Sequence, residues 1–325
     1  MPRVLLFGSG GIGVLYILFM QRAGVDVVCI CRSNYAVAQS RGFRIKSSIF
    51  GNHSFQPKIF RTVAEASAAG YTRFDYIFIC TKAFSAGQPT LADALQPVLH
   101  DKNTLLVIIQ NGIGVEKKIA KDIPHHPIIS GVTYSPTTQV TPGDFVHSEV
   151  QRLYLGRYPA STPVEDDHAL RELCSLLTKG GADVMLSADV QVERWRKLIG
   201  NASWNPICAL SGCRDLEFLK ASKYASELVQ NVMNEIVTVA SASGYGDVIT
   251  TDAATDQFNR SARRSWPGVE PSMLADMRSG NRMEVEAIIG EVVKAAKDVG
   301  VCTPRLETLY ALLAGLDWSI QQRKV

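Results

Sequence analysis

Short, wholly apolar runs alternate with helical patterns over the first part of the chain. The runs at residues 4–7 and 27–31 flank a glycine-rich turn and a helix predicted from about residue 12 to residue 23. Apolar runs without polar alternation are typical of parallel strands that are covered on both faces. The pattern predicts an α/β domain at residues 1–188 with a Rossmann-type parallel sheet. Further strands are expected at 76–80, 105–109, 128–132 and 184–186, with hairpin-type strands at 43–50 and 145–155.

The hydrophobic pattern changes after about Asp189, where helical periodicity takes over and continues toward the C-terminus. Glycine and proline residues interrupt it and are expected to end or separate helices. We therefore expect a second, all-helical domain at residues 189–325. Within it, the polar stretch 244–264 is predicted to be a loop or a short exposed helix.

Composition and charge exclude several classes of protein. The 325 residues include 34 Lys and Arg and 31 Asp and Glu, which gives a formal net charge of +3. No run of five or more basic residues occurs, so a nucleic-acid partner is not expected. The 7 cysteines form no Cys-x-x-Cys pair. This usage is typical of buried thiols in a reducing compartment and predicts a cytoplasmic protein.

The uncharged stretch from Val4 to Met20 resembles a signal peptide or a short membrane span. It is shorter than the roughly 20 apolar residues that a spanning helix needs. The glycines at its centre would destabilise a continuous helix by about 1 kcal/mol each. We therefore predict a strand, a turn and a helix here, and no membrane partner.

The turn at the centre of this stretch fits the pattern G-x-G-x-x-G between a strand and a helix, which is typical of dinucleotide binding. The first glycine permits the tight turn, the second lets the backbone approach a pyrophosphate, and the third lets the helix pack against the strand. Free N–H groups at the helix N-terminus would attract the phosphates. A tight turn without a ligand is the alternative. The predicted cofactor-binding residues of the turn are Gly8, Ser9, Gly10, Gly11, Ile12 and Gly13.

The residue after the second apolar run favours one dinucleotide over the other. NAD-binding folds usually carry Asp or Glu here, which accepts a hydrogen bond from the ribose 2′-OH. This chain has Arg32, followed by Ser33 and Asn34. A guanidinium would pair with a 2′-phosphate, so NADP(H) is predicted in preference to NAD(H). A solvated Arg at a strand end is the alternative interpretation.

Polar residues also follow two more of the predicted strands, as Thr81-Lys82 and as Gln110-Asn111-Gly112. Taken singly, they indicate a solvent-facing Lys and a turn. The carboxyl ends of parallel strands meet at one edge of a sheet, where ligands of such folds bind. Together with Arg32, these residues are therefore expected to converge on the cofactor.

A polar stripe marks the helical half of the chain. On a helix, Lys197, Asn201 and Asn205 fall within a sector of about 80°, and their neighbours are largely apolar. Burying an amide is costly unless it finds a partner, which favours a ligand-binding face. A solvated polar face is the alternative. Pro206 removes one helical hydrogen bond and predicts a kink near Asn205.

Two further segments carry polar candidates. Ser272 is predicted to cap a helix whose first N–H groups could bind a carboxylate, although capping alone is the more common role. Glu284 and Glu286 open the next predicted helix, where the helix dipole by itself favours acids. His147 is interpreted as structural. No metal-ligand spacing and no Ser-His-Asp pattern is present, so no metal is expected.

In combination, these motifs resemble the ketopantoate reductase (2-dehydropantoate 2-reductase) family nearly from end to end. An isolated glycine pattern would be weak, whereas the ordered set is specific. The motifs are the turn at 8–13, Arg32, Thr81-Lys82, Gln110-Asn111-Gly112, Gly131-Val132-Thr133, Pro142-Gly143, Trp195-Arg196-Lys197-Leu198, Asn201, Asn205-Pro206, Ser272-Met273-Leu274-Ala275-Asp276 and Arg282-x-Glu284.

The resemblance implies a function and roles for single residues. NADPH would reduce the C2 carbonyl of a 2-oxo acid, most directly ketopantoate to pantoate, with the catalytic residue Lys197 as general acid. Glu284 would lie near the nicotinamide ribose and the substrate hydroxyl, and Lys82 and Asn111 would line the cofactor. The residues expected to hold substrate are Lys197, Asn201, Asn205 and Ser272.

The sequence also departs from the family pattern. Asp215 stands where many members have an Asn that contacts substrate, and a carboxylate there could repel an acidic substrate or select another one. A reductase of a different bulky branched or aromatic 2-oxo acid is the first alternative. A non-catalytic NADP(H)-binding regulator on the same fold is the second. The protein is also considered a possible homodimer.

Overall fold

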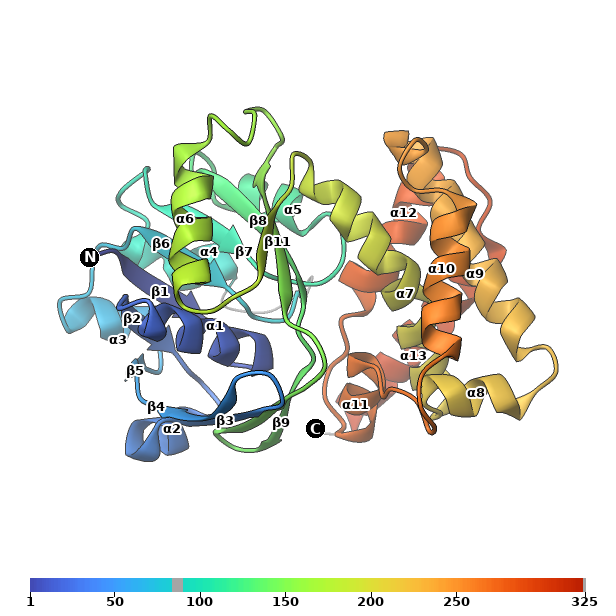
Figure 1. Cartoon of the computed structure of the whole chain (residues 1–325), viewed down its shortest axis with the longest axis horizontal. Helices are drawn as coiled ribbons and strands as arrows, with labels where there is room; N and C mark the ends of the chain where they lie inside the picture. Colours follow the sequence, from blue (N-terminus) through green and yellow to red (C-terminus); the bar gives the residue numbers. More distant parts are fainter. Residues whose placement is uncertain (84–89, 324–325) are drawn as a thin grey trace. The chain divides into compact units, whose positions relative to one another are not determined.

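The computed structural model describes residues 1–83 and 90–323, and these form two compact units (Figure 1). The first, the sheet unit, contains residues 1–82, 90–110 and 115–190. The second, the helical unit, contains residues 191–323, and it also takes in Ala83 and residues 111–114. The α/β fold with a helical C-terminal part that the pattern predicts is confirmed.

An eight-stranded sheet with the order β12-β11-β8-β7-β6-β1-β2-β5 forms the centre of the sheet unit. Neighbouring strands from β5 to β8 are parallel, whereas β11 runs antiparallel to β8 and parallel to β12. The central strands are buried on both faces, which is why their sequences are continuous apolar runs. The strands are β1 (Arg3–Phe7), β2 (Asp26–Ile30), β5 (Lys58–Phe60), β6 (Tyr76–Ile79), β7 (Leu105–Ile108), β8 (Ile128–Tyr134), β11 (Arg152–Tyr158) and β12 (Val184–Leu186).

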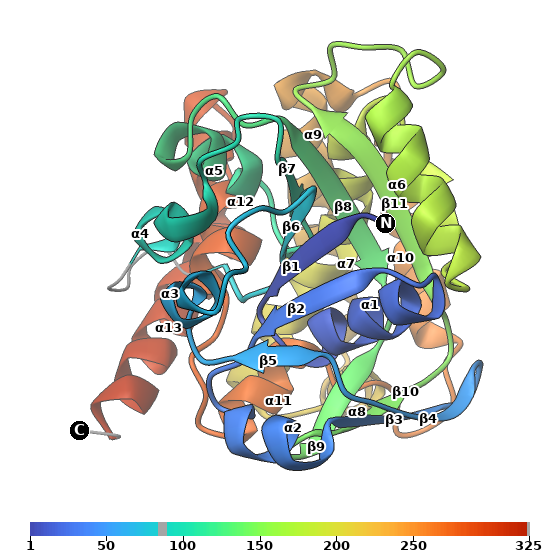
Figure 2. The same cartoon turned by 90° about the vertical axis from the view of Figure 1, so that its left-hand side faces the viewer.

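Helices cover both faces of this sheet. Figure 2 shows α1 and α6 on one face and α3, α4 and α5 on the other. This arrangement follows from crossover connections that run in opposite directions from β1 along the sheet. The helices are α1 (Gly11–Arg22), α2 (Tyr35–Arg41), α3 (Val63–Ala68), α4 (Leu91–Leu95) with the 3-10 turn η1 (Gln96–Val98), α5 (Val115–Asp122) and α6 (His168–Lys179).

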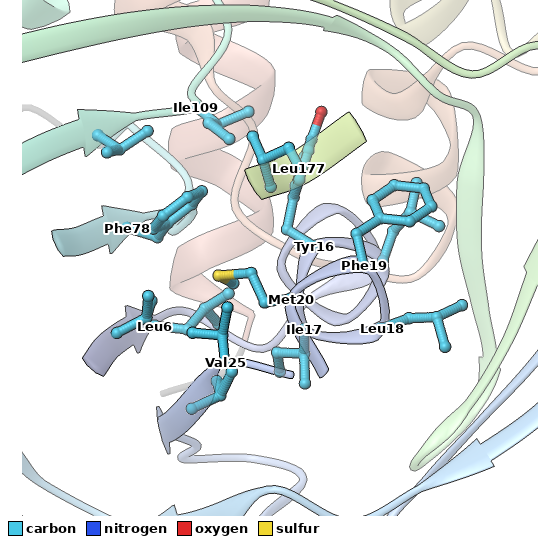
Figure 3. Packing of buried hydrophobic residues seen from close by; sticks show 14 of the residues in the cluster. Leu6, Tyr16, Ile17, Leu18, Phe19, Met20, Val25, Phe78, Ile109 and Leu177 are labelled. Atoms are coloured by element: carbon cyan, nitrogen blue, oxygen red, sulfur yellow. The ribbon is translucent and has the colours of Figure 1, made fainter. Parts of the chain in front are cut away.

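Helix α1 explains the uncharged stretch near the start of the chain. Gly13 to Met20 are all buried, because the helix packs between the sheet and α6. Figure 3 shows Tyr16 and Met20 among residues of the strands and Leu177 of α6. A helix that is apolar all round is therefore a core helix here. None of the helices in residues 1–83 and 90–323 combines the length and the apolar content that spanning a membrane requires.

A second sheet, in the order β4-β3-β10-β9, accounts for the alternating segments. The segment at 43–50 forms β3 (Phe43–Ser47), which pairs with β4 (Gly51–Phe55) in a hairpin. The segment at 145–155 was expected to form hairpin-type strands, but its two parts belong to different sheets and do not pair with each other. Its first part is β10 (Asp144–His147), which pairs with β3 and with β9 (Thr137–Thr141), and its second part enters the main sheet as β11.

The helical unit is built around one apolar core, to which α7, α9, α12 and α13 contribute most. The polar stretch 244–264 contains a helix, α10, and its Ser261 is buried and accepts a hydrogen bond from Trp204 Nε1 at 3.0 Å. The elements are α7 (Val190–Ser211), α8 (Asp215–Ala221), α9 (Ala225–Ala240), η2 (Ser241–Tyr245), α10 (Thr251–Ala262), α11 (Ser272–Arg278), η3 (Glu286–Gly290), α12 (Glu291–Asp298) and α13 (Pro304–Gln322).

Candidate active site

The glycine-rich turn joins β1 to α1, and packing requires three of its four glycines. Gly8 has φ +109°, a left-handed conformation, and a Cβ there would lie 2.6 Å from Thr81 N. A Cβ on Gly11 would overlap Thr137 O, and one on Gly13 would overlap Gly8 O. Gly10 differs, because it is exposed and a Cβ there would meet no atom within 4 Å. The space next to Gly10, at the N-cap of α1, is therefore open to a ligand.

The other two residues of the turn face the protein. Ser9 is buried, with an exposed fraction of 8%. Ile12 is half-buried against the core of the sheet unit. The turn therefore offers its backbone, rather than these side chains, to a bound group.

Arg32 follows β2 and is exposed. Its guanidinium forms no ion pair within the described ranges of the chain. The turn after it is held by a reciprocal amide pair, in which Asn34 Nδ2 donates to Gln139 Oε1 at 2.9 Å and Gln139 Nε2 donates to Asn34 Oδ1 at 3.1 Å. A guanidinium on a fixed turn at the end of β2 is suited to an anionic ligand.

The next strand ends lie side by side in the sheet unit. Lys82 is exposed and comes shortly after β6. Gln110, just past β7, donates through Nε2 to the carbonyl oxygen of Thr81 at 2.7 Å. Strands β6 and β7 are parallel neighbours, so this bond ties their carboxyl ends together.

The chain then enters the helical unit at Asn111–Gly114. Gly112 has φ +90°, and a Cβ there would overlap Ala287 O. Ile113 N donates to that same carbonyl at 3.2 Å, and Arg194 Nη1 donates to Gly112 O at 2.8 Å. Residue 287 lies in the π-helical turn η3, a wide turn of the kind that is frequent at functional sites. This close contact fixes the backbone next to Asn111.

Asn111 is the middle of a chain of hydrogen bonds within the helical unit. Lys197 Nζ donates to Asn111 Oδ1 at 2.9 Å, and Asn111 Nδ2 donates to Glu284 Oε2 at 3.2 Å. The other carboxylate oxygen of Glu284 accepts from Ala83 N at 3.0 Å. Residues that are far apart in the sequence thus form one polar cluster, and we call Lys197, Asn111 and Glu284 the Lys–Asn–Glu cluster.

The segment before η3 places Glu284 in this cluster. Residues 281–284 are not helical, and the main chain there is held by α13, since Met283 N donates to Asp317 Oδ1 at 2.7 Å. Glu284 is 7% exposed. Its neighbour Glu286 instead accepts from the Tyr310 hydroxyl at 2.9 Å. The structure thus distinguishes the two acids, because Glu284 accepts a hydrogen bond from Asn111 and Glu286 accepts one from Tyr310.

Electrostatics around Lys197 suit a proton donor. Desolvation, and then the positive charge of Arg194 one helical turn away, lower the pKa of Lys197 from 10.5 to about 8, while the Glu284 carboxylate acts in the opposite direction. A lysine that titrates near neutral pH can exchange its proton with a reacting group. Arg194 is 2% exposed, and sequence reasoning missed it. Its position three residues before Lys197 could have identified it, because residues with this spacing are neighbours on the surface of a helix.

The two asparagines of α7 differ in their surroundings. Asn201 is half-buried, whereas Asn205 is 4% exposed and its amide nitrogen Nδ2 has no hydrogen-bond partner. A buried amide without a partner is costly. Helix α7 continues beyond Pro206 to Ser211, so the amide stays in the helical register of Lys197. This orphaned donor is the kind of group that a polar ligand would satisfy.

The predicted cap at Ser272 is wrong. Pro271 occupies the N-cap position of α11, Ser272 is the first helical residue, and no side chain caps this end. A proline with φ −63° and ψ 152° precedes a helix well, so the helix begins one residue later than a Ser cap would require. Ser272 is exposed.

Asp215 has structural partners. It is fully buried, and its Oδ1 accepts from Val269 N at 2.7 Å and from Leu216 N at 2.8 Å. Its Oδ2 accepts from Arg264 Nη1. The carboxylate is thus neutralised and saturated within the helical unit, so it does not present a free negative charge to a substrate.

Similarity to known proteins agrees with this arrangement. Family models described as ketopantoate reductase PanE/ApbA and as its C-terminal part match residues 4–160 and 189–317. A 2-dehydropantoate 2-reductase of Nostoc sp. is 26% identical over 318 residues, which are 96% of this chain and 94% of that protein. The crystal structure of 2-dehydropantoate 2-reductase from Methylococcus capsulatus superposes with a TM-score of 0.83 at 29% identity, covering 98% of this chain and 97% of that one.

The same fold occurs in D-mandelate dehydrogenase, in a ternary structure with NADH and anilino(oxo)acetate. The TM-score is 0.83 at 21% identity, and the match covers 98% of this chain and 99% of that one. The two family models together span both units and include the glycine-rich turn, Asn111, Lys197 and Glu284. The chain therefore belongs to the ketopantoate reductase family, whose members are oxidoreductases that act on CH–OH groups.

Proposed function

We propose that this protein reduces a 2-oxo acid to the 2-hydroxy acid with NADPH, and that 2-dehydropantoate (ketopantoate), which gives pantoate, is its substrate. The observation that carries the proposal is the Lys–Asn–Glu cluster, which holds an ammonium of lowered pKa on a rigid helix. In this proposal the first 188 residues bind mainly the cofactor, and residues 189–325 bind the substrate.

The residues present fit a dinucleotide. The open space beside Gly10 admits a pyrophosphate, and the N-terminus of α1 offers it free N–H groups. Arg32 supplies positive charge at the end of β2, where a 2′-phosphate would lie. When bound, the nicotinamide supplies the hydride. Lys82, Asn111 and Glu284 are the further residues that we assign to cofactor binding.

Lys197 is the proposed general acid. Reduction of a carbonyl places negative charge on its oxygen, and an ammonium stabilises that charge and then gives up a proton. The bond from Nζ to Asn111 Oδ1 at 2.9 Å fixes the direction of one ammonium hydrogen and so the position of the ammonium group. Glu284, held by Asn111 and Ala83, supports the charged form of the lysine.

Asn201, Asn205 and Ser272 are the proposed contacts to the substrate's carboxylate and hydroxyl groups. The support is strongest for Asn205, whose buried Nδ2 needs an acceptor. A carboxylate or a hydroxyl oxygen would satisfy it. Asp215, which is paired with Arg264, does not oppose an acidic substrate.

Aromatic or other bulky 2-oxo acids form the second candidate substrate class. The observation that favours it is the likeness in fold to D-mandelate dehydrogenase, which was solved with anilino(oxo)acetate. That neighbour was solved with NADH, whereas Arg32 favours the 2′-phosphate of NADPH in this chain.

A panel of 2-oxo acids tests the proposal. Purified protein is mixed with NADPH and with ketopantoate, branched 2-oxo acids or aromatic 2-oxo acids, and kcat/KM is measured from NADPH oxidation. We expect the highest value with ketopantoate. A higher value with an aromatic acid would select the second class, and no oxidation with any acid would reject the reductase proposal. Lys197→Ala should lose at least about 10²-fold in kcat, while Lys297→Ala, which removes an exposed ammonium from α12, serves as the matched control.

A further inference from the structure

A second arginine stands next to Arg32 at the edge of the sheet. Strand β5 pairs in parallel with β2, with Ile30 opposite Phe60, and Cys31 N donates to Phe60 O at 2.9 Å. The residues that follow the C-terminal ends of these two strands are therefore neighbours. On β2 the chain continues to Arg32, and on β5 it continues to Arg61, which is also exposed.

The guanidinium of Arg61 has a defined position. It lies over the ring of Tyr35, 4.2 Å from the ring centroid. Tyr35 begins α2, and its N–H donates to the carbonyl oxygen of Arg32 at 3.2 Å. A stacked guanidinium keeps its N–H edge free for hydrogen bonds in the plane. Arg61 is thus held beside the turn that carries Arg32.

The acid that contacts the main chain of Arg61 forms no ion pair with its guanidinium. Glu65 Oε2 accepts from the backbone N–H of Arg61 at 2.9 Å, which ties the carboxylate to the main chain. Within residues 1–83 and 90–323, the guanidinium of Arg61 forms no ion pair. Its partner is the aromatic ring, so its charge is available to an anion.

The turn between the two arginines is rigid. The amide pair of Asn34 and Gln139 connects it to β9, and Asn34 is 3% exposed. A site that must recognise one phosphate requires such fixed positions. The two arginines meet this requirement, because Arg32 lies on the fixed turn and the guanidinium of Arg61 is stacked on the ring of Tyr35.

We propose that Arg61 is a second selectivity residue for the cofactor, which together with Arg32 binds the 2′-phosphate of the adenosine half. This inference rests on the proposed function, since it concerns the same NADPH. A 2′-phosphate carries nearly two negative charges, and a guanidinium can bind it strongly through two parallel N–H···O hydrogen bonds. The ribose of a dinucleotide lies at the end of β2, which is where both arginines are.

Equilibrium binding tests the assignment without turnover. Isothermal titration calorimetry would compare Arg61→Ala, Arg32→Ala and the parent protein for NADPH, NADH, adenosine 2′,5′-bisphosphate and AMP. Arg61→Ala should weaken the two ligands with a 2′-phosphate by about tenfold or more, and should leave NADH and AMP nearly unchanged. Arg73→Ala, which removes an exposed arginine before β6 and so at the opposite edge of the sheet, is the control.

Each other outcome has a separate meaning. Equal weakening of all four ligands by Arg61→Ala would assign the residue to stacking on adenine and overturn the inference. A selective loss in Arg32→Ala with none in Arg61→Ala would also overturn it, while NADPH binding by the proposed function stands. A parent protein that binds no NADPH would reject the proposed function itself. Thermal unfolding confirms that each variant folds, and Arg61→Lys should recover part of the selectivity.

Discussion

The ammonium of Lys197 donates a hydrogen bond of 2.9 Å to the side-chain oxygen of Asn111. The two residues come from α7 and from the loop after β7, and Glu284 holds the other end of the Asn111 amide at 3.2 Å. The Glu284 carboxylate fixes the orientation of the Asn111 amide, because only the NH₂ group of that amide can donate a hydrogen bond to it. The amide oxygen of Asn111 therefore faces Lys197. The pair therefore aims a proton donor with little freedom to rotate.

Removal of this ammonium is the first prediction. Lys197→Ala should lower kcat for 2-oxo acid reduction at least about 10²-fold, because the proton donor and the charge at the carbonyl oxygen are both lost. Affinity for NADPH, measured by fluorescence titration, should change little. Full turnover in this variant would reassign the general acid to another residue.

The pKa of Lys197 predicts the pH dependence of the reaction. Burial and Arg194 lower it to about 8, and only the protonated lysine can donate a proton to the alkoxide. The rate of reduction should therefore be level below about pH 8 and fall as the pH rises through that value. The reverse oxidation needs the neutral amine, so its rate should rise over the same interval. Reduction that continues unchanged to pH 10 would contradict this assignment.

Because Gly10 and Gly13 are packed differently, the same substitution should affect mainly ligand binding at Gly10 and mainly stability at Gly13. Gly13→Ala should destabilise the fold by about 1–3 kcal/mol, because its methyl group would overlap Gly8 O. Gly10→Ala has room and should cost less than about 1 kcal/mol, as expected for an N-cap position. It should nevertheless weaken NADPH binding, since the methyl group would occupy the space next to a pyrophosphate.

Thermal unfolding and calorimetric titration of the two glycine variants separate these effects. Unchanged NADPH affinity in Gly10→Ala would mean that the pyrophosphate does not approach the turn there. Gly11→Ala is the second control for packing, because its Cβ would overlap Thr137 O.

Asp215 is expected to matter for stability and not for substrate choice. Asp215→Ala removes a buried carboxylate from two backbone N–H groups and from Arg264, which should cost about 2–4 kcal/mol. Denaturant unfolding would measure this loss. The order of kcat/KM across the 2-oxo acid panel should not change. A changed order in a folded variant would place Asp215 in contact with substrate.

Local patterns in the sequence predicted much of the fold. Apolar runs identified most strands of the main sheet, because strands that are buried on both faces need them, and the glycine turn identified the first strand–helix connection. The segment 145–155 was predicted to form hairpin-type strands, since its alternation does not show that β10 and β11 belong to different sheets.

The site was harder to predict, because its contacts link distant residues. Lys197, Asn111 and Glu284 each had a local reason for attention, but their hydrogen bonds connect positions up to 173 residues apart. The pairing of Asp215 with Arg264 is similarly invisible in the sequence. The prediction of a cap at Ser272 was wrong by one residue, because the N-cap of α11 is Pro271, and sequence patterns seldom define a helix end to a single residue.

The membership of residues 111–114 in the helical unit has a consequence for exchanging parts between relatives. A chimera that joins residues 191–323 to a foreign nucleotide-binding domain leaves behind the amide that orients the lysine and the N–H that satisfies the carbonyl of Ala287. A working transplant would have to carry Asn111–Gly114 and also Ala83. Lys197, the proposed general acid, belongs to a structural unit that is built from separate segments of the sequence.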